Sequence, residues 1–556
     1  MDSGERRRQT ARTARLSFLA IANLAALIIL VRAFTGGDGD EVVAHNTQPA
    51  VEVLSAPAIE PEPREPLKEK LRPVVLNLRD SALEGKIEGC IAAAVRDASK
   101  RSGGKVNAQN TTIAVHVFDP KGSGALAERQ ANIALRPASN MKLVTSAAAL
   151  VVLGAEWNFE TRFDSSAQIV SGVLRGDLVV RAGGDPLFDA EGDGRAGHLL
   201  APVIKELRAR GIRKISGDIV LDQGLYLEAG PGPGWPSESQ HWQEHCALSA
   251  GFSANAGCLT AVVASTTNGS QAKAELYPKW HGLERVGSVK TVKASARLNI
   301  AVGATAAKAT LRGDIPSNVG AWSSRFAHPD PVALFGTVLL GALRDGGIDV
   351  LGQVTRMRNA PAGENLATLR TPLWPLLAPI NTDSNNSVAD QLFLAMGAAA
   401  GGEGTRSGGR VVVTSALSEL GVSGEGLVQV DGSGLSRDDR VTAKQLSSLL
   451  AGVLKLDAKT RDAFISSLAV AGTSGSLESR MKAGPARGRV FAKTGWIEGT
   501  GSLSGYAETL SGERLCFSIL VDYPKVAGMN KYCWKPMQDR ICEELVRWSR
   551  SGGKVR

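Results

Sequence analysis

The sequence predicts an α/β protein in which an antiparallel sheet is flanked by helices and interrupted by inserted, mostly β domains. Three observations predict this. Between residues 75 and 153, a helical pattern, strand-like runs and a buried helix follow one another. Residues 166–345 alternate short strands with glycine-containing turns, in a chain where 62 of 556 residues are glycine. From residue 378 onward helical runs return. We therefore expect one domain built from residues 73–165 and 346–556 around an insertion.

Four elements are expected in the first part of this domain, residues 73–165. Residues 75–98 have an amphipathic helical pattern. Residues 111–118 alternate and contain β-branched side chains, which predicts a strand, and we expect a second strand at 131–135. Residues 143–153 are apolar and alanine-rich without proline or glycine, so they predict a buried helix.

Elements of the insertion and of the second part of the domain are predicted in the same way. Alternation of apolar and polar residues indicates strands, and a helical period indicates helices. Strands are expected at residues 167–173, 177–182, 218–222, 297–302, 308–313, 489–493 and 515–522. Helices are expected at residues 199–210, 331–344, 388–400, 410–420, 442–454 and 537–548.

The N-terminus has the pattern of an export segment. A basic cluster precedes an uncharged, mostly apolar run at residues 16–31; the cluster consists of Arg6, Arg7, Arg8, Arg12 and Arg15. We expect residues 1–34 to be a cytoplasmic tip and a helix that anchors the chain in the membrane, or alternatively a cleaved signal. Residues 35–72, rich in Gly, Pro and Glu, predict a flexible linker. The rest is expected in the extracytoplasmic, or periplasmic, cell envelope.

Charge and cysteine content restrict the function classes. The net charge of +9 comes partly from the N-terminal arginines, so it does not indicate nucleic-acid binding. The six cysteines could pair in fifteen ways, and an exported chain permits disulfides. Cys246 and Cys258 are close enough in sequence to pair, with buried free thiols as the alternative.

The predicted buried helix begins with a reactive pair. Ser139 and Lys142 are three residues apart, which places them on one helical face. A serine hydroxyl needs a base to become a nucleophile, and burial lowers the pKa of a lysine enough for it to be that base. The N–H groups of the helix N-terminus favour a developing oxyanion. Taken alone, S-x-x-K is better explained by a helix cap followed by a solvated lysine.

Two further motifs follow in order. Ser384, Asn385 and Asn386 form a polar turn before a predicted helix, and Lys493, Thr494 and Gly495 end a predicted strand. A lysine and a hydroxyl at a strand edge suit a substrate carboxylate, and a glycine lets substrate approach the backbone. Each motif alone is an ordinary turn. The occurrence of all three motifs in this order, each beside the expected helix or strand, is improbable by chance.

The ordered set S-x-x-K, S-x-N and K-T-G resembles the penicillin-recognising serine enzymes. The long gap between the first two motifs is similar to that of the low-molecular-mass class C penicillin-binding proteins, the D-alanyl-D-alanine carboxypeptidase/endopeptidase family. Five other runs agree: G-D-L then G-G-D-P at 176–186, I-S-G-D at 215–218, D-G-S-G-L-S-R at 431–437, A-G-T-S-G-S-L at 471–477, and L-S-G-Y at 503–506. The resemblance covers the chain from about residue 75 and implies a penicillin-binding/β-lactamase-like transpeptidase fold.

The resemblance also implies roles. Ser139 would attack the D-Ala-D-Ala carbonyl to form an acyl-enzyme, Lys142 would take its proton, and Ser384 would relay a proton to the leaving amine. Asn386 would hold the substrate amide and Lys142. The terminal carboxylate would be bound by Lys493 and Thr494 beside Gly495, and the oxyanion by the N–H groups of Ser139 and Trp496.

Three details depart from the family pattern or match it only by rough spacing. Asp222 sits about where the family places an acid that contacts the amino end of the stem peptide. Trp496 stands where a small or hydroxylated residue is more usual, and its side chain could narrow the cleft. Residues 241–258 diverge from the family's usual run.

The resemblance implies peptidoglycan stem peptides as substrates, β-lactams as covalent ligands, and no metal or organic cofactor. Other readings stay open. His241, Glu244 and His245 match the H-x-x-E-H zinc-protease pattern, which requires a helix to bring both histidines to one face. The chain could also be an anchored, non-catalytic peptidoglycan-binding or β-lactam-sensing module, or a β-lactamase.

Overall fold

The computed structural model describes residues 79–122, 124–189, 196–227 and 230–550. The chain divides into two compact units after Leu76, and all of these residues belong to the second unit. The predicted anchor at residues 1–34 and linker at 35–72 lie outside the described residues. Within the described residues, every helix is too short or too polar to cross a bilayer.

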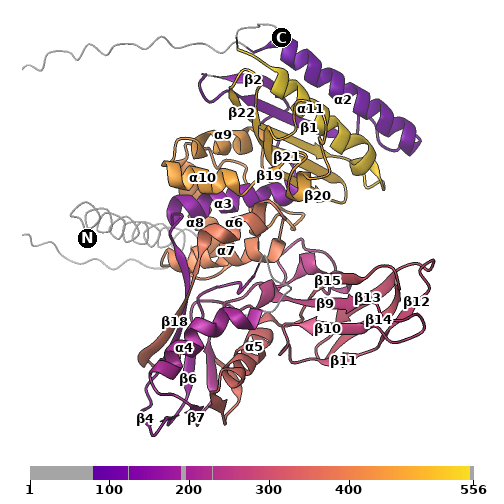
Figure 1. Cartoon of the computed structure of the whole chain (residues 1–556). Helices are drawn as coiled ribbons and strands as arrows, with labels where there is room; N and C mark the ends of the chain where they lie inside the picture. The colour runs from indigo at the N-terminus through magenta and orange to yellow at the C-terminus, as the bar shows by residue number, and fades with distance from the viewer. Residues whose placement is uncertain (1–78, 123, 190–195, 228–229, 551–556) are drawn as a thin grey trace, which may run out of the picture. The chain divides into compact units, whose positions relative to one another are not determined.

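One six-stranded sheet, antiparallel throughout, forms the centre of the first α/β part (Figure 1). Its strands, in spatial order, are β19 (Ala469–Val470), β20 (Val490–Ile497), β21 (Thr500–Glu508), β22 (Arg514–Asp522), β1 (Thr112–Phe118) and β2 (Ala125–Arg129). The strand β1 therefore pairs on one side with its sequence neighbour β2 and on the other with β22, where Thr112 lies opposite Asp522.

Helices cover both faces of this sheet (Figure 1). Because side chains alternate along a strand, Ile113, Val115 and Val117 of β1 join one core while Ala114 joins the other. The first core is closed by α2 (Ser81–Ser102) and α11 (Lys535–Arg547). The second is closed by α3 (Met141–Val152), α6 (Leu373–Asn381), α7 (Asn386–Ala399), α8 (Arg406–Glu419), α9 (Ala443–Val453) and α10 (Ala458–Ser466).

Half of the insertion is an α/β unit with parallel strand pairs. Its larger sheet has the order β17 (Val354–Met357), β8 (Ile219–Asp222), β6 (Leu178–Arg181), β3 (Asn158–Ser165) and β18 (Glu364–Pro372). Its smaller sheet has the order β16 (Asp349–Val350), β7 (Lys214–Ile215), β5 (Val173–Leu174) and β4 (Ile169–Val170). The helices α4 (Ala201–Ala209) and α5 (Pro331–Asp345) pack in the same core. The larger sheet thus takes strands from both sides of the predicted range 166–345: β3 precedes that range, and β17 and β18 follow it.

The other half of the insertion contains only strands and short turns of helix (Figure 1). One sheet has the order β10 (Lys273–Tyr277), β9 (Cys258–Ala264) and β15 (Ala321–Ala327). In the other, β11 (Glu284–Val286), β12 (Val289–Val292) and β13 (Asn299–Ala304) all pair with β14 (Lys308–Pro316). The prediction of mostly β domains therefore holds for this half, whereas the first half is α/β.

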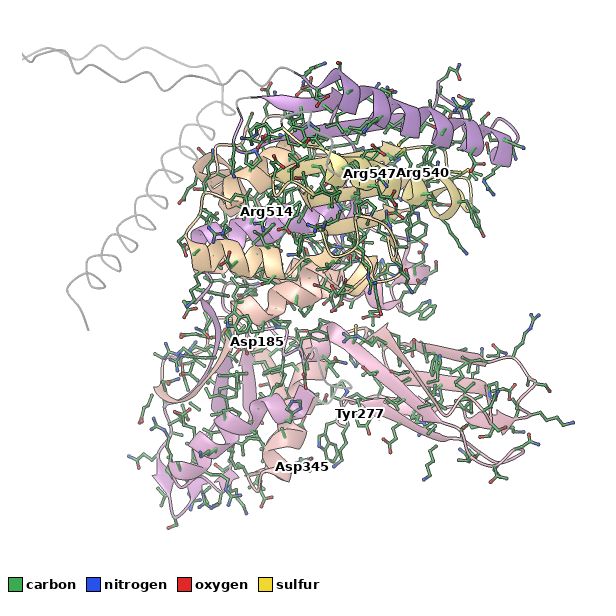
Figure 2. The ribbon with its side chains drawn as sticks, turned by 45° about the horizontal axis from the view of Figure 1, so that its top comes forward. Asp185, Tyr277, Asp345, Arg514, Arg540 and Arg547 are labelled. Atoms are coloured by element: carbon green, nitrogen blue, oxygen red, sulfur yellow. The ribbon has the colours of Figure 1, made fainter. Side chains whose placement is uncertain are left out.

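The two halves of the insertion meet at Trp280. Its indole Nε1 donates a hydrogen bond to Asp345 Oδ2 at the end of α5, 3.0 Å away. A Cβ on Gly341 of α5 would overlap this indole ring, so glycine permits the close approach. Figure 2 shows Tyr277 and Asp345 at this junction.

Three local expectations were wrong. The second strand is β2, at 125–129 rather than 131–135, because Gln130 takes a positive φ of 45° and turns the chain away. The expected strand 167–173 is a small hairpin of β4 and β5, turned at Ser171 and Gly172. Cys246 and Cys258 are buried free thiols, and the four other cysteines are also free.

Candidate active site

Ser139 lies in a single turn of 3-10 helix, Ala138–Asn140, that leads directly into α3. The residue before it, Ala138, has a positive φ of 47°, which is uncommon for a residue with a Cβ and is often found at functional sites. Lys142 follows on the first turn of α3, and its Nζ lies 3.1 Å from Ser139 Oγ. The structure therefore brings the predicted nucleophile and base into hydrogen-bonding contact.

Lys142 is completely buried and has two further hydrogen-bond acceptors. Its Nζ donates to Asn386 Oδ1 at 2.6 Å and to the Ser433 carbonyl oxygen at 2.7 Å. Burial lowers the pKa of Lys142 from 10.5 to about 7, although the charge of Asp431 opposes this shift. A neutral amine has two N–H groups and one lone pair. If the two fixed acceptors take both N–H groups, the lone pair is left for the proton of Ser139.

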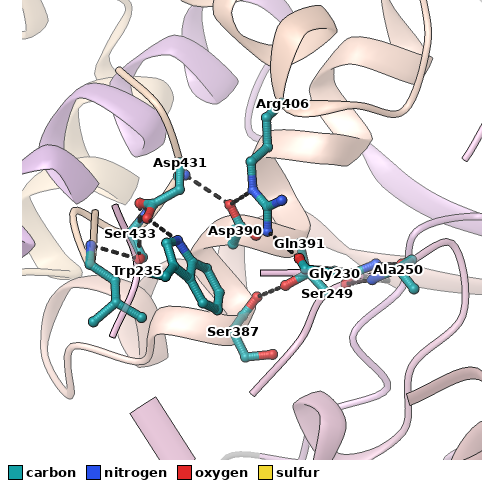
Figure 3. A network of polar contacts seen from close by, with 12 residues as sticks. Gly230, Trp235, Ser249, Ala250, Ser387, Asp390, Gln391, Arg406, Asp431 and Ser433 are labelled. Carbon is teal, nitrogen blue, oxygen red and sulfur yellow. Dashed lines mark hydrogen bonds and ion pairs between the residues drawn. The ribbon is translucent and has the colours of Figure 1, made fainter. Parts of the chain in front are cut away.

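A tight loop holds the Ser433 carbonyl in place (Figure 3). The buried Asp431 carboxylate accepts hydrogen bonds from Ser433 N at 2.8 Å and Gly434 N at 2.6 Å. It also accepts from Trp235 Nε1 of the insertion, at 2.7 Å. Gly434 has a φ of 80°, and a Cβ there would overlap the carbonyl oxygen of Ala138, so glycine lets the loop pack against the serine turn.

An ion pair between α7 and α8 also supports this loop. Asp390 of α7 accepts from Gly432 N at 3.0 Å and pairs with Arg406 Nη2 of α8 at 2.7 Å. Figure 3 shows Asp390 and Arg406 beside Asp431 and Trp235. Satisfied buried networks of this kind fix a single geometry. The position of the Ser433 carbonyl is consequently set by contacts from three separate parts of the chain.

The second motif forms the turn between α6 and α7. Ser384 has a φ of 66° and lines the same cavity as Ser139. The side chain of Asn385 caps α7 by accepting from Val388 N at 3.0 Å, which places Asn386 at the first helical position. Asn386 Nδ2 donates to the His245 carbonyl oxygen at 2.8 Å, and this bond fixes Asn386 Oδ1 toward Lys142. The insertion thus contacts this residue as well.

The third motif lies on β20. Lys493 is buried, and its Nζ donates to its neighbour's carbonyl, Thr494 O, at 2.9 Å. Burial, followed by the nearby charge of Lys142, lowers the pKa of Lys493 well below its ordinary value, and a bound carboxylate would favour its charged form. Thr494 Oγ1 donates to Ser476 Oγ at 2.8 Å. Lys493, Ser476 and Thr494 thus provide polar groups suited to an anion beside the serine.

A cavity of about 200 Å³ joins these groups, with Ser139, Ser384, Thr494, Gly495 and Trp496 in its wall. A Cβ on Gly495 would overlap Ser502 Oγ and come within 3.0 Å of Ser139 N. The absence of a side chain therefore lets β20 lie against the serine turn. The side chain of Trp496 is 59% exposed, so it stands at the rim and does not fill the cavity.

The close packing of β20 against the serine turn leads to a prediction for a substitution of Gly495. We expect Gly495→Ala to slow covalent acylation by a β-lactam by about a hundredfold or more, because the added methyl displaces β20 from the oxyanion position near Ser139 N. The measurement is the second-order acylation rate constant with a fluorescent penicillin. Gly424→Ala is the matched control, since a Cβ there meets open space. An unchanged rate in a folded Gly495→Ala protein would show that β20 does not border the reacting carbonyl.

Asp222 is not brought to this site. Its carboxylate is buried and pairs with Arg181 Nη1 at 2.6 Å. It also accepts from the backbone N–H groups of Gly224, Asn359 and Ala360 at 2.9–3.0 Å. Asp222 lines a different cavity, which shares no lining residue with that of Ser139. Its observed contacts are those of a structural ion pair within the insertion.

The H-x-x-E-H stretch does not form the helix that zinc ligation by this pattern requires. Only Glu244–Cys246 is helical there, as one 3-10 turn that follows another at Glu238–Gln240. His241 Nε2 contacts the Pro236 carbonyl oxygen at 2.9 Å. Among the described residues, no group of three or more potential metal ligands gathers.

Several site groups were not assigned from the sequence. The Ser433 carbonyl is a backbone group, and its run D-G-S-G was noted only as a point of resemblance. Ser476 likewise lies in the run A-G-T-S-G-S-L. Arg480, Lys535 and Gln538 also line the cavity, and the last two come from the N-terminal turn of α11. Nothing in the local sequence distinguishes these three residues from others of their type.

Known proteins resemble this chain over most of its length. The model of the D-Ala-D-Ala carboxypeptidase 3 (S13) family matches residues 104–537. The chain is 32% identical over 463 residues to a D-alanyl-D-alanine carboxypeptidase of an Actinomadura species, covering 80% of this chain and 79% of the relative. It is 28% identical over 395 residues to one from Haemophilus influenzae, covering 68% and 79%.

A solved structure supports the fold. The crystal structure of penicillin binding protein 4 from Haemophilus influenzae aligns with a TM-score of 0.67 at 24% identity, covering 82% of this chain and 99% of that one. The predicted penicillin-binding α/β fold is therefore confirmed for the described part of the chain.

Proposed function

The chain belongs to the D-Ala-D-Ala carboxypeptidase 3 (S13) family and is a serine peptidase of peptidoglycan metabolism, and from this premise we propose that Ser139 is its nucleophile and Lys142 its general base. One observation supports this assignment most strongly. A buried amine with a pKa of about 7 lies 3.1 Å from the serine hydroxyl, with two other acceptors fixing its direction. An amine with this pKa is free to accept a proton near neutral pH.

Acylation proceeds at the carbonyl carbon of a D-alanine residue. Ser139 Oγ forms the new C–O bond while its proton passes to Lys142 Nζ. The carbonyl oxygen becomes an oxyanion beside the N–H groups of Ser139 and Trp496, where Gly495 keeps β20 close. Collapse of this intermediate breaks the C–N bond, and the proton on Lys142 returns through Ser384 to the leaving amine. A water molecule then hydrolyses the ester on Ser139 and restores the free serine.

Substrate is held at two places. Asn386 contacts Lys142 through its Oδ1 and lines the approach to Ser384, so it suits an amide of the acyl half. Lys493 and Thr494 suit the carboxylate next to the scissile bond. A β-lactam presents the same carboxylate beside a strained amide, and we infer that it acylates Ser139 as well.

The leaving group decides between two activities. Free D-alanine leaves in a carboxypeptidase reaction, whereas the amine of a diamino acid in a neighbouring stem peptide leaves in an endopeptidase reaction. Both bonds follow a D-alanine carbonyl, so one acylating site serves both. We propose that this protein cleaves D-Ala-D-Ala and also D-Ala–diamino acid cross-links.

A location in the cell envelope follows from this substrate. We propose that residues 1–34 anchor the chain, with the N-terminal arginines in the cytoplasm and the catalytic unit outside it. Expressed at full length, the chain should sediment with membranes, and its intact mass should retain the N-terminal segment. A soluble product whose mass lacks residues 1–34 would instead establish a cleaved signal.

The test of the proposed function is intact-mass measurement of the full-length protein with benzylpenicillin, followed by product analysis on two substrates. We expect one covalent adduct, release of D-alanine from a pentapeptide monomer, and cleavage of a cross-linked muropeptide dimer. No adduct on folded protein would contradict the acylating site. An adduct without peptide turnover would identify a sensing or binding module, and rapid penicillin turnover with inert peptides would identify a β-lactamase.

A further inference from the structure

The cavity beside Ser139 continues past Thr494 to the first turn of α11. Lys535 and Gln538 lie three residues apart there, on one face of the helix, and both line the cavity. Arg480 also lines the cavity, and its Nη2 donates to the Lys535 carbonyl oxygen at 3.2 Å. None of these three residues belongs to the S-x-x-K, S-x-N or K-T-G motifs, and none has a role in the acylation steps above.

Lys535 is a solvent-exposed lysine on the first turn of α11. Within the described residues, its Nζ has no hydrogen-bond or ion-pair partner. Asp539, whose charge raises the pKa of Lys535, already accepts from Arg480 Nε at 2.9 Å and from Arg480 Nη2 at 2.6 Å. Partial burial and the charge of Arg480 lower the pKa of Lys535, as expected for a cation placed beside another cation. A bound anion would relieve this repulsion.

Gln538 supplies a second unused donor. Its side chain is 1% exposed, and its Oε1 accepts from Arg480 Nη2 at 3.1 Å, which fixes the orientation of the amide. The Nε2 atom of that amide is buried and has no hydrogen-bond partner. A buried N–H donor left unpaired is costly and indicates a missing acceptor. Lys535 and Gln538 both line the same small cavity.

We propose that Lys535 and Gln538 form a binding site for a second carboxylate on the leaving half of the substrate, in addition to the one held by Lys493 and Thr494. Arg480 is its positioning residue, since it orients the Gln538 amide and occupies Asp539. This proposal rests on the proposed peptidase function and specifies its substrate class.

The substrate class follows from counting carboxylates. Free D-alanine brings one carboxylate, which Lys493 and Thr494 bind. The leaving half of a cross-link is a whole stem peptide, which carries the carboxylate next to its amine and further carboxylates along its length. Only such a leaving half can pair with Lys535 and Gln538. The site therefore favours cross-linked peptides over terminal D-alanine.

The test compares Lys535→Met with wild-type full-length protein on three substrates. These are a pentapeptide monomer, a cross-linked muropeptide dimer, and the same dimer with its leaving-half carboxylates amidated except the one next to the scissile bond. We expect kcat/KM on the unmodified dimer to fall about ten- to a hundredfold in Lys535→Met, the size of a charge-assisted contact. We expect kcat/KM on the monomer and on the amidated dimer to stay within about twofold of wild type.

Two matched variants complete the design. Lys531→Met removes a neighbouring exposed lysine that does not line the cavity and should change nothing, while Lys535→Arg should retain the preference for the unmodified dimer. Equal losses on dimer and monomer, no loss on the dimer, or the same loss in Lys531→Met would overturn the proposal. A wild-type protein that forms no penicillin adduct and cleaves neither peptide would instead contradict the proposed function itself, so the two failures are distinguishable.

Discussion

Replacing Ser139 with alanine should abolish the covalent penicillin adduct and lower peptide hydrolysis by about ten-thousandfold or more, the loss typical of a removed nucleophile. The physical reason is the absence of any other hydroxyl in contact with the Lys142 amine among the described residues. The measurements are intact mass after incubation with benzylpenicillin and release of D-alanine from a pentapeptide.

The fold should survive this change, because Ser139 Oγ makes its one hydrogen bond with Lys142 and the alanine leaves the rest of the turn intact. The melting temperature should stay close to that of wild type. Ser418→Ala, at an exposed position of α8, is the matched substitution and should keep full activity. A persistent adduct in Ser139→Ala would place the nucleophile elsewhere, with Ser384 as the next residue to replace.

Lys142→Met should slow acylation by about a thousandfold or more, since a general base contributes this much to the transfer of the serine proton. Methionine fills a similar volume without an amine. It leaves the Ser433 carbonyl and Asn386 Oδ1 unpaired, which would also lower stability. The acylation rate constant should be measured by rapid mixing with a fluorescent penicillin, alongside chemical denaturation. A rate within about tenfold of wild type would mean that another group takes the proton.

The same lysine predicts a pH profile for the wild-type protein. Only the neutral amine can accept a proton, and its fraction falls as pH drops below the pKa of about 7. The acylation rate should therefore rise with pH through neutrality, level off above it, and fall about tenfold per pH unit on the acid side. A flat profile between about pH 5.5 and 8 would contradict Lys142 as the base.

Local sequence patterns were enough to find the elements that carry these residues. The apolar run at 143–153 predicted α3, and the polar turn at 384–386 predicted the start of α7, because caps, turns and periodicity are set by near neighbours. The strand expected at 489–493 is the first part of β20, which continues through the third motif to Ile497. Resemblance then supplied the roles. The strand expected at 131–135 was wrong because a single positive φ at Gln130 moved the strand to 125–129, and periodicity does not encode φ.

Contacts between segments that are far apart in the chain could not be predicted from the sequence. The Ser433 carbonyl reaches Lys142 only because Asp431, Trp235 and Asp390 converge from three elements. Asp222 was placed at the site by rough spacing, yet its spatial neighbour is Arg181 on the adjacent strand. The unpaired donors of α11 could not be predicted from the sequence for the same reason. Whether an N–H group has an acceptor depends on residues that are close in space, not on its neighbours in the chain.

The place of β1 in the central sheet has a consequence for biosynthesis. Because β1 is flanked by β22, the sheet under Ser139 is complete only after residue 522 has been synthesised. Contacts between such distant segments make folding slow and dependent on the whole chain. Every nascent or truncated chain that ends before β22 therefore carries the serine without a working site. We therefore expect hydrolysis only from chains that extend past β22.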